Sequence, residues 1–91
     1  MALEVGDVFW RDEPIRIEVR AGGQGLRLHA QVRPARGGGL VARRTLRQDA
    51  GGGHAVELPP LPPGSYRVTV RGGRALEPVE DVFVVVPQRS R

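Results

Sequence analysis

The chain has 91 residues, a net charge of +4 and no cysteine, so it is one domain without disulfides, thiol chemistry or cysteine-based zinc sites. All fourteen basic residues are arginine. This composition favours the codon bias of a GC-rich genome, and not selection for a polyanionic partner, as the cause of the positive charge. No segment has the pattern of a signal peptide or a membrane span, so a cytoplasmic protein is expected if Met1 is the native start.

Apolar and polar residues alternate at every second position along much of the chain, the pattern of half-buried β-strands. After an opening strand within 3–10, the alternation predicts strands at residues 14–21, 26–33, 40–48, 54–58, 65–71 and 79–86. Glycine-rich turns separate them, and no window of eleven or more residues has helical spacing free of Gly or Pro. The sequence therefore predicts an all-β sandwich or barrel of about seven strands.

Two of these strands have an ambiguous inner face. In residues 40–48 the inner set is predicted to be Leu40, Ala42 and Leu46, which places Arg44 inward and indicates an edge strand, a bulge or a different register. The last strand ends in VFVVV and is apolar on both faces. With Val82, Val84 and Val86 inward, Phe83 and Val85 point outward, where a strand that is apolar on both sides needs a second cover.

A run of prolines, LPPLPP at 58–63, precedes the sixth strand. A PxxP segment can bind an SH3-type groove, but such ligands normally carry a flanking basic residue, and Val56 and Glu57 precede the run here. We therefore interpret it as a corner between two strands, where no ladder donor is needed. Gly64 then supplies the turn, and Tyr66 enters the next strand facing inward.

LPPGSYRVTV, residues 61–70, resembles the start of the penultimate strand in bacterial immunoglobulin-like sandwiches, which include transthyretin-like repeats of surface adhesins and carboxypeptidase regulatory-like domains. VFWRDEPIRIEV, residues 8–19, is similar to the start of the second strand in macroglobulin-type domains. The resemblance implies an immunoglobulin-like antiparallel β-sandwich over residues 1–87, followed by a flexible tail at 88–91. It further implies a spacer, scaffold or interaction module beside another domain. The isopeptide chemistry of some adhesin repeats is excluded, because this chain has no Lys and no Asn.

The chain offers no recognisable catalytic constellation. No nucleophile-elbow pattern surrounds its serines, and a triad would need Ser or Thr with a histidine and an acid. His29 and His54 are widely separated and are interpreted as solvated polar residues, not metal ligands. The glycine-rich segments lack the following helix that a phosphate cradle needs. The sequence therefore predicts no enzymatic activity, no metal and no cofactor.

A candidate binding face follows from the expected pairing of the third and sixth strands in one sheet. The partner-binding residues predicted there are four arginines, with two apolar residues at their margin: Arg27, Arg33, Arg67, Arg71, Phe83 and Val85. No acid occupies the outward positions of these two strands, and arginine beside apolar residues is typical of protein interfaces. An ordinary solvated face is the open alternative.

The favoured function is a non-enzymatic protein-interaction or scaffold module, either an accessory domain of a larger protein or a subunit of an assembly. Its partner is expected to be another protein or a neighbouring domain of acidic or mixed charge, with no membrane involved. Self-association stays open, although arginines meeting arginines would repel. The alternative is an anion or nucleic-acid binding domain on the same face, which the scarcity of aromatic stacking platforms disfavours.

Overall fold

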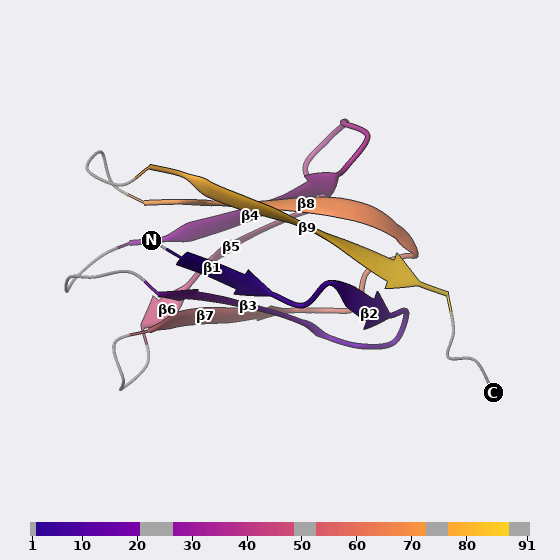
Figure 1. Cartoon of the computed structure of the whole chain (residues 1–91), viewed down its shortest axis with the longest axis horizontal. Coiled ribbons are helices and arrows are strands. Elements are labelled where there is room, and N and C mark those ends of the chain that lie inside the picture. Colours follow the sequence, from indigo (N-terminus) through magenta and orange to yellow (C-terminus); the bar gives the residue numbers. More distant parts are fainter. Residues whose placement is uncertain (1, 21–26, 49–52, 73–76, 88–91) are drawn as a thin grey trace.

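The computed structural model describes residues 2–20, 27–48, 53–72 and 77–87. These residues form nine strands and no helix (Figure 1). The strands are β1 (Ala2–Val5), β2 (Val8–Trp10), β3 (Ile15–Arg20), β4 (His29–Pro34), β5 (Ala42–Thr45), β6 (Arg47–Gln48), β7 (His54–Leu58), β8 (Gly64–Arg71) and β9 (Val79–Val86). The predicted all-β fold is confirmed. In the described ranges, no helix is long and apolar enough to span a membrane.

The strands make two sheets. One has four strands in the order β1-β3-β7-β6, and the other has five in the order β2-β9-β8-β4-β5. The two sheets form two layers in Figure 1, with β8 and β9 in the upper layer and β3 and β7 in the lower. Neighbouring strands are antiparallel except for β2, which runs parallel to β9. The expected pairing of the third and sixth predicted strands is present as β4 beside β8.

The strand count exceeds the predicted seven because two predicted strands are each divided between the sheets. The opening segment breaks at Gly6 and Asp7, so that β1 pairs with β3 in one sheet and β2 pairs with β9 in the other. A Cβ on Gly6 would lie 3.1 Å from the Phe9 ring, so the break is closely packed. Residues 40–48 divide in the same way into β5 and β6, on either side of the buried Leu46.

The core lies between the sheets and consists mainly of alternate strand residues from both, together with Leu28 and Leu46 from the segments beside strands. Its fully or nearly fully buried members are Phe9, Ile15, Ile17, Val19, Leu28, Ala30, Val32, Leu46, Leu58, Tyr66, Val68, Val70, Phe83 and Val85. Three aromatic rings meet inside it. Phe83 stacks on Tyr66 with ring centroids 5.5 Å apart, and Phe9 packs edge-on against Phe83 at 5.4 Å. The predicted inward face of the sixth strand is confirmed.

The predicted register of the last strand is wrong. Phe83 and Val85 are 1% and 3% exposed, whereas Val82 and Val84 are 50% and 37% exposed. Alternation could not decide between the registers, because one places Glu80 inward and the other places Asp81 inward. The phenyl ring of Phe83 decides it, because the free energy gained on burial grows with the apolar area removed from water, and Phe has more of that area than Val.

The ambiguous Arg44 is explained by its place on an edge strand. It lies opposite Ala30, on the inward side of β5, yet it is exposed. Since β5 is the last strand of its sheet, this side chain can leave the layer and reach solvent, and charge on an edge also disfavours pairing with another chain. Leu40, expected in the inner set, is 44% exposed because it precedes the strand.

The proline run connects β7 in one sheet to β8 in the other, which confirms its interpretation as a corner. The Tyr66 hydroxyl donates a hydrogen bond to the Pro62 carbonyl oxygen across this corner. Gly64 has φ = +152°, and a Cβ there would face the Tyr66 ring at 3.9 Å. Positive φ is disfavoured for residues with a Cβ, and most strongly for branched ones, so the glycine is required by the backbone.

Candidate functional site

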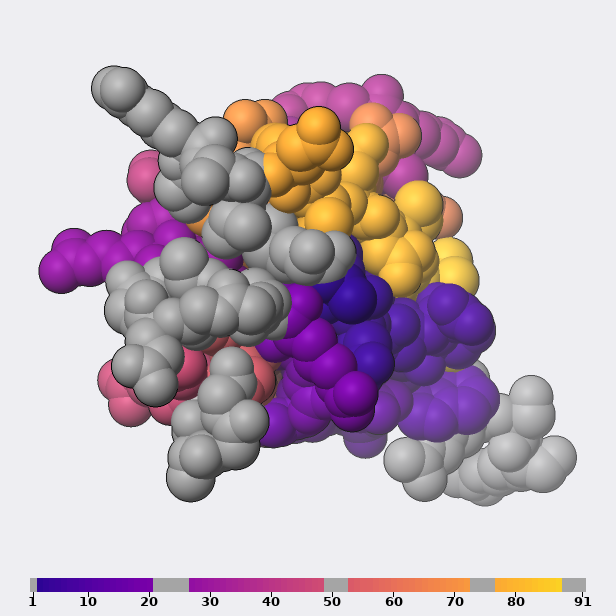
Figure 2. Space-filling model, turned by 60° about the vertical axis from the view of Figure 1, so that its left-hand side comes forward, coloured from indigo at the N-terminus to yellow at the C-terminus, as the bar shows by residue number. Residues whose placement is uncertain are grey.

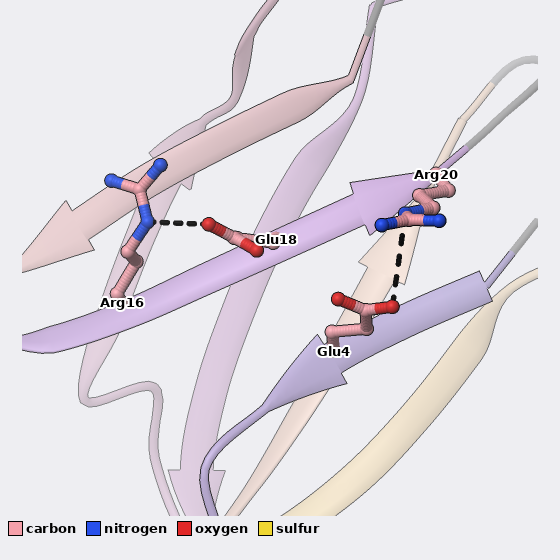
Figure 3. A network of polar contacts seen from close by, with 4 residues as sticks. All are labelled: Glu4, Arg16, Glu18 and Arg20. Atoms are coloured by element: carbon pink, nitrogen blue, oxygen red, sulfur yellow. Dashed lines mark hydrogen bonds and ion pairs between the residues drawn. The ribbon is translucent and has the colours of Figure 1, made fainter.

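The outer face of the four-stranded sheet is electrostatically balanced. In the described part of the chain, its outward strand positions carry three arginines and three glutamates: Glu4, Arg16, Glu18, Arg20, Arg47 and Glu57. Arg16 Nε lies 2.6 Å from Glu18 Oε1, and Arg20 Nε lies 3.8 Å from Glu4 Oε1 (Figure 3). Arg16 also lies opposite Glu57 in the register of β3 and β7. This face therefore carries equal numbers of the two charges, and two ion pairs link four of these six residues.

The outer face of the five-stranded sheet is basic. The outward strand positions that the structure describes carry four arginines and one glutamate: Arg33, Arg43, Arg67, Arg71 and Glu80. Arg33 and Arg67 lie directly opposite each other on β4 and β8, a like-charge pairing that disfavours folding. Over the described ranges, no ion pair involves any of these arginines. Arg33 Nη1 instead donates to Gln31 Oε1 at 3.0 Å, and Glu80 Oε2 accepts from Thr69 Oγ1 at 3.4 Å.

The structure places the predicted binding residues in two groups. Arg33, Arg67 and Arg71 share the outer face of the five-stranded sheet, and Arg27 is exposed just before β4 begins. Phe83 and Val85 do not lie at the margin of that face, because both point into the core. The prediction that Phe83 and Val85 form the apolar part of the site is therefore wrong, and other residues form that part.

The apolar residues on this face are three exposed valines. Val8, Val82 and Val84 are 56%, 50% and 37% exposed. Val8 on β2 pairs with Val84 on β9, and Val82 lies opposite Arg67 on β8. In Figure 2 the yellow residues of β9 lie at the surface close to the indigo N-terminal segment. We call Val8, Val82, Val84, Arg33 and Arg67 together the valine–arginine face.

Sequence reasoning missed these valines for two reasons. First, the predicted register of the last strand differs by one residue from the observed register. Second, the parallel pairing of β2 with β9 joins segments about 75 residues apart in the sequence, and alternation within one strand cannot reveal such a pairing. The available signal was the two-sided apolarity of VFVVV, because a strand with valines on both faces exposes some of them in either register.

The described residues also line two grooves outside this face. One, of about 540 Å³, is walled by prolines at the corner before β8 and by the β4–β5 hairpin. The other, of about 400 Å³, lies where β5 approaches β7, and three arginines line it: Arg16, Arg44 and Arg47. Glu57 also lines the second groove, so arginine is in excess there. The first groove combines apolar walls with one charged side chain, Arg36.

The two histidines have different environments. His29 is half-buried, and its Nδ1 lies 3.2 Å from Thr45 Oγ1 on the neighbouring strand. His54 is 1% exposed, and neither ring nitrogen has a hydrogen-bond partner. The interpretation of His54 as a solvated residue is therefore wrong. It occupies the first position of β7, in alternation with Val56 and Leu58, so the same pattern that placed those residues inward applies to it.

Groups suited to acid–base or metal chemistry are not gathered in the described ranges. No cluster of three or more His, Asp or Glu that could hold a metal ion occurs there. Burial raises the pKa of the Tyr66 phenol above its ordinary value of 10.0, so the hydroxyl can donate to the Pro62 carbonyl up to a more alkaline pH than an exposed phenol could. The role of Tyr66 is therefore to hold the proline corner in place.

No protein-family model matches the chain, and no curated protein matches it in sequence. Its fold is similar to part of a solved structure from Bacteroides vulgatus ATCC 8482, described as a putative glycoside hydrolase. The TM-score is 0.69 at 15% sequence identity, and the match covers 92% of this chain but 17% of the other. At this identity the likeness establishes a shared fold alone. The chain spans 17% of the length of the Bacteroides vulgatus protein.

Proposed function

We propose that the chain is an immunoglobulin-like sandwich that works as a non-enzymatic interaction module. The tyrosine corner supports this architecture, since a tyrosine near the start of the penultimate strand that bonds to backbone a few residues upstream is a hallmark of such sandwiches. Tyr66 and Pro62 make this contact here. The division of the first segment between two sheets, as β1 and β2, is consistent with the same architecture.

A role as an accessory domain draws support from the fold comparison. The matching fold occupies 17% of the Bacteroides vulgatus chain, so in that protein a domain of this size is one part of a longer polypeptide. A domain of this kind works by contacting a neighbouring domain or a separate protein. We propose no glycosidic chemistry for this chain, because a shared fold does not carry function.

The observation that carries the proposal is the contrast between the two outer sheet faces. The four-stranded sheet balances its arginines with glutamates and forms two ion pairs, whereas the valine–arginine face exposes valines beside arginines without an ion pair among the described residues. Arginine can lay its aliphatic stem on apolar surface and keep its head hydrated, so such a face stays soluble when free. Arginine is also enriched at interface hot spots.

The partner surface that complements this face has an apolar half, opposite the valines of β2 and β9, and an acidic half, opposite the arginines of β8 and β4. Val82 beside Arg67 would be covered by an aliphatic or aromatic side chain, and carboxylates would pair with the guanidinium groups of Arg33 and Arg67. A second copy of this chain would bring the same arginines into opposition, and this disfavours a symmetric dimer through the face.

A second candidate function is the binding of a polyanion. The observation that favours it is the groove beside β5, which is lined by Arg16, Arg44 and Arg47 and by a single acid among its described residues, Glu57. The two functions differ in salt dependence. Binding of a polyanion releases counterions and weakens steeply as ionic strength rises, whereas a contact centred on exposed valines weakens little.

The experiment compares partner capture from native lysate by the wild type, Arg67→Glu and Val82→Ser. Arg20→Glu is the matched control, since Arg20 is an exposed arginine on the other sheet with its side chain 81% exposed. We expect both face variants to lose the same protein and the control to retain it, with binding then reproduced by the purified partner. Capture that survives both face variants, or that wild type never achieves, would contradict the proposal.

A further inference from the structure

The proline-walled groove lies at the end of the five-stranded sheet that holds the start of β8. Its volume is about 540 Å³, within the usual range of small-ligand sites. Its walls come from two connections that are distant in sequence, the corner before β8 and the hairpin between β4 and β5. The residues that matter are Pro34, Arg36, Val41, Pro62, Pro63 and Tyr66.

Hydrogen bonds within the chain preorganise the walls of this groove. Tyr66 donates to the Pro62 carbonyl, the Ala35 amide donates to the Ser65 carbonyl at 2.9 Å, and the Gly37 amide donates to the Pro34 carbonyl at 3.0 Å. Proline also has a fixed φ, so the walls have little conformational freedom to lose. Binding to a preorganised surface avoids much of the ordering cost that weakens association.

The chemistry of the lining specifies what fits. Pro34, Pro62, Pro63 and Val41 present apolar surface, and Val41 is 40% exposed. Among the described lining residues, Arg36 is charged and none is acidic. A guanidinium group binds a carboxylate through two parallel hydrogen bonds. The complementary ligand therefore combines an apolar group for the proline walls with a carboxylate for Arg36.

We propose that this groove binds a short segment of a partner protein in which an apolar side chain is adjacent to Asp or Glu. The site is separate from the valine–arginine face and does not depend on it. The two are neighbours, because Ser65 lines the groove and also lies opposite Val84 on β9. A partner that occupies both would gain from bivalent attachment.

The test is an NMR titration of the ¹⁵N-labelled full chain with acetyl-Ala-Leu-Glu-Ala-amide. The matched probe is the same peptide with Gln in place of Glu, which removes the carboxylate alone. We expect shift changes centred on the groove residues Arg36, Val41 and Tyr66. Because Arg36 is exposed, the Glu peptide should bind a few-fold more tightly than the Gln peptide, the gain expected of an exposed ion pair. Arg36→Gln should abolish this preference, while Arg43→Gln, an exposed arginine outside the groove, should preserve it.

Equal affinity for the two peptides, or no shift changes at any peptide concentration up to tens of millimolar, would overturn the proposal. Shift changes centred on Arg33 and Arg67 would also overturn it, because they would assign the acidic peptide to the valine–arginine face. Failure here is distinguishable from failure of the proposed function, since Arg67→Glu and Val82→Ser leave the groove intact and Arg36→Gln leaves the face intact.

Discussion

The ring of Tyr66 on β8 stacks on the ring of Phe83 on β9, with centroids 5.5 Å apart and planes inclined by 22°. The two residues are also direct partners in the register of these strands. Because side chains alternate across a strand, this one contact turns Val82 and Val84 outward. The valine–arginine face therefore depends on an aromatic contact inside the core.

The register can be tested by comparing Phe83→Ala with Val82→Ser. Phe83 is 1% exposed and Val82 is 50% exposed, so we expect losses of about 3–5 kcal/mol for the first and within about 0.5 kcal/mol for the second. Urea denaturation followed by circular dichroism measures both. A larger loss for Val82→Ser would mean that the register is one residue off and that the face lacks its valines.

Gly64→Val is predicted to lower the free energy of unfolding more than Pro60→Ala does. Gly64 has φ = +152°, and a non-glycine residue in such a conformation costs about 1–3 kcal/mol. Pro60 is exposed within the corner, so Pro60→Ala should cost less than about 1 kcal/mol, chiefly by loosening the unfolded chain. If chemical denaturation ranks Pro60→Ala as the worse change, the proline run has a role beyond connecting the sheets.

The Tyr66 phenol should make stability depend on alkaline pH. Burial raises its pKa in the folded state above 10.0, whereas the unfolded chain titrates near the ordinary value. The stabilisation is therefore complete below about pH 10 and is lost as the pH rises through the folded-state pKa. Tyr66→Phe should cost about 1 kcal/mol at neutral pH through the lost hydrogen bond to Pro62.

Urea midpoints from pH 8 to pH 11.5 measure this effect for wild type and Tyr66→Phe. The chain has one tyrosine, and arginine stays protonated throughout, so the phenylalanine variant is a direct control. We expect the two stability curves to converge above pH 10. A parallel decline in both proteins would show that another group is responsible.

The buried His54 should tolerate an apolar replacement. Neither of its ring nitrogens has a hydrogen-bond partner, and an unsatisfied buried polar group costs about 1–3 kcal/mol. His54→Leu should therefore leave the free energy of unfolding unchanged or raise it. A loss above about 2 kcal/mol in denaturant titrations would instead indicate that the ring makes a hydrogen bond, for example to bound water.

Most strands, the proline corner and the inward side chain of Tyr66 could be predicted from the sequence, because period-two alternation and turn residues are local signals. The register of β9 could not be predicted, since it is set by the contact of Phe83 with Tyr66 and Phe9, three side chains from different strands. The parallel pairing of β2 with β9 is also non-local. His54 is a different case, because alternation with Val56 and Leu58 already placed it inward, and its polarity was given too much weight.

The candidate face was predicted in part. The arginines of β4 and β8 could be placed together, because the pairing of those two strands follows from the expected fold. The excess of arginine over acid on their face depends on the whole surface, since the glutamates that pair with Arg16 and Arg20 lie on β3 and β1 of the other sheet. Only the three-dimensional structure separates the balanced face from the basic one.

The central claim, that the valine–arginine face is where a partner protein binds, is tested most directly by arginine footprinting. Free and partner-bound protein are treated with an arginine-specific dicarbonyl reagent, and mass spectrometry gives the modification rate at each site. Our account predicts that Arg33 and Arg67 become several-fold less reactive than Arg20 when the partner is bound. Protection of Arg20 with Arg33 and Arg67 still fully reactive would contradict it.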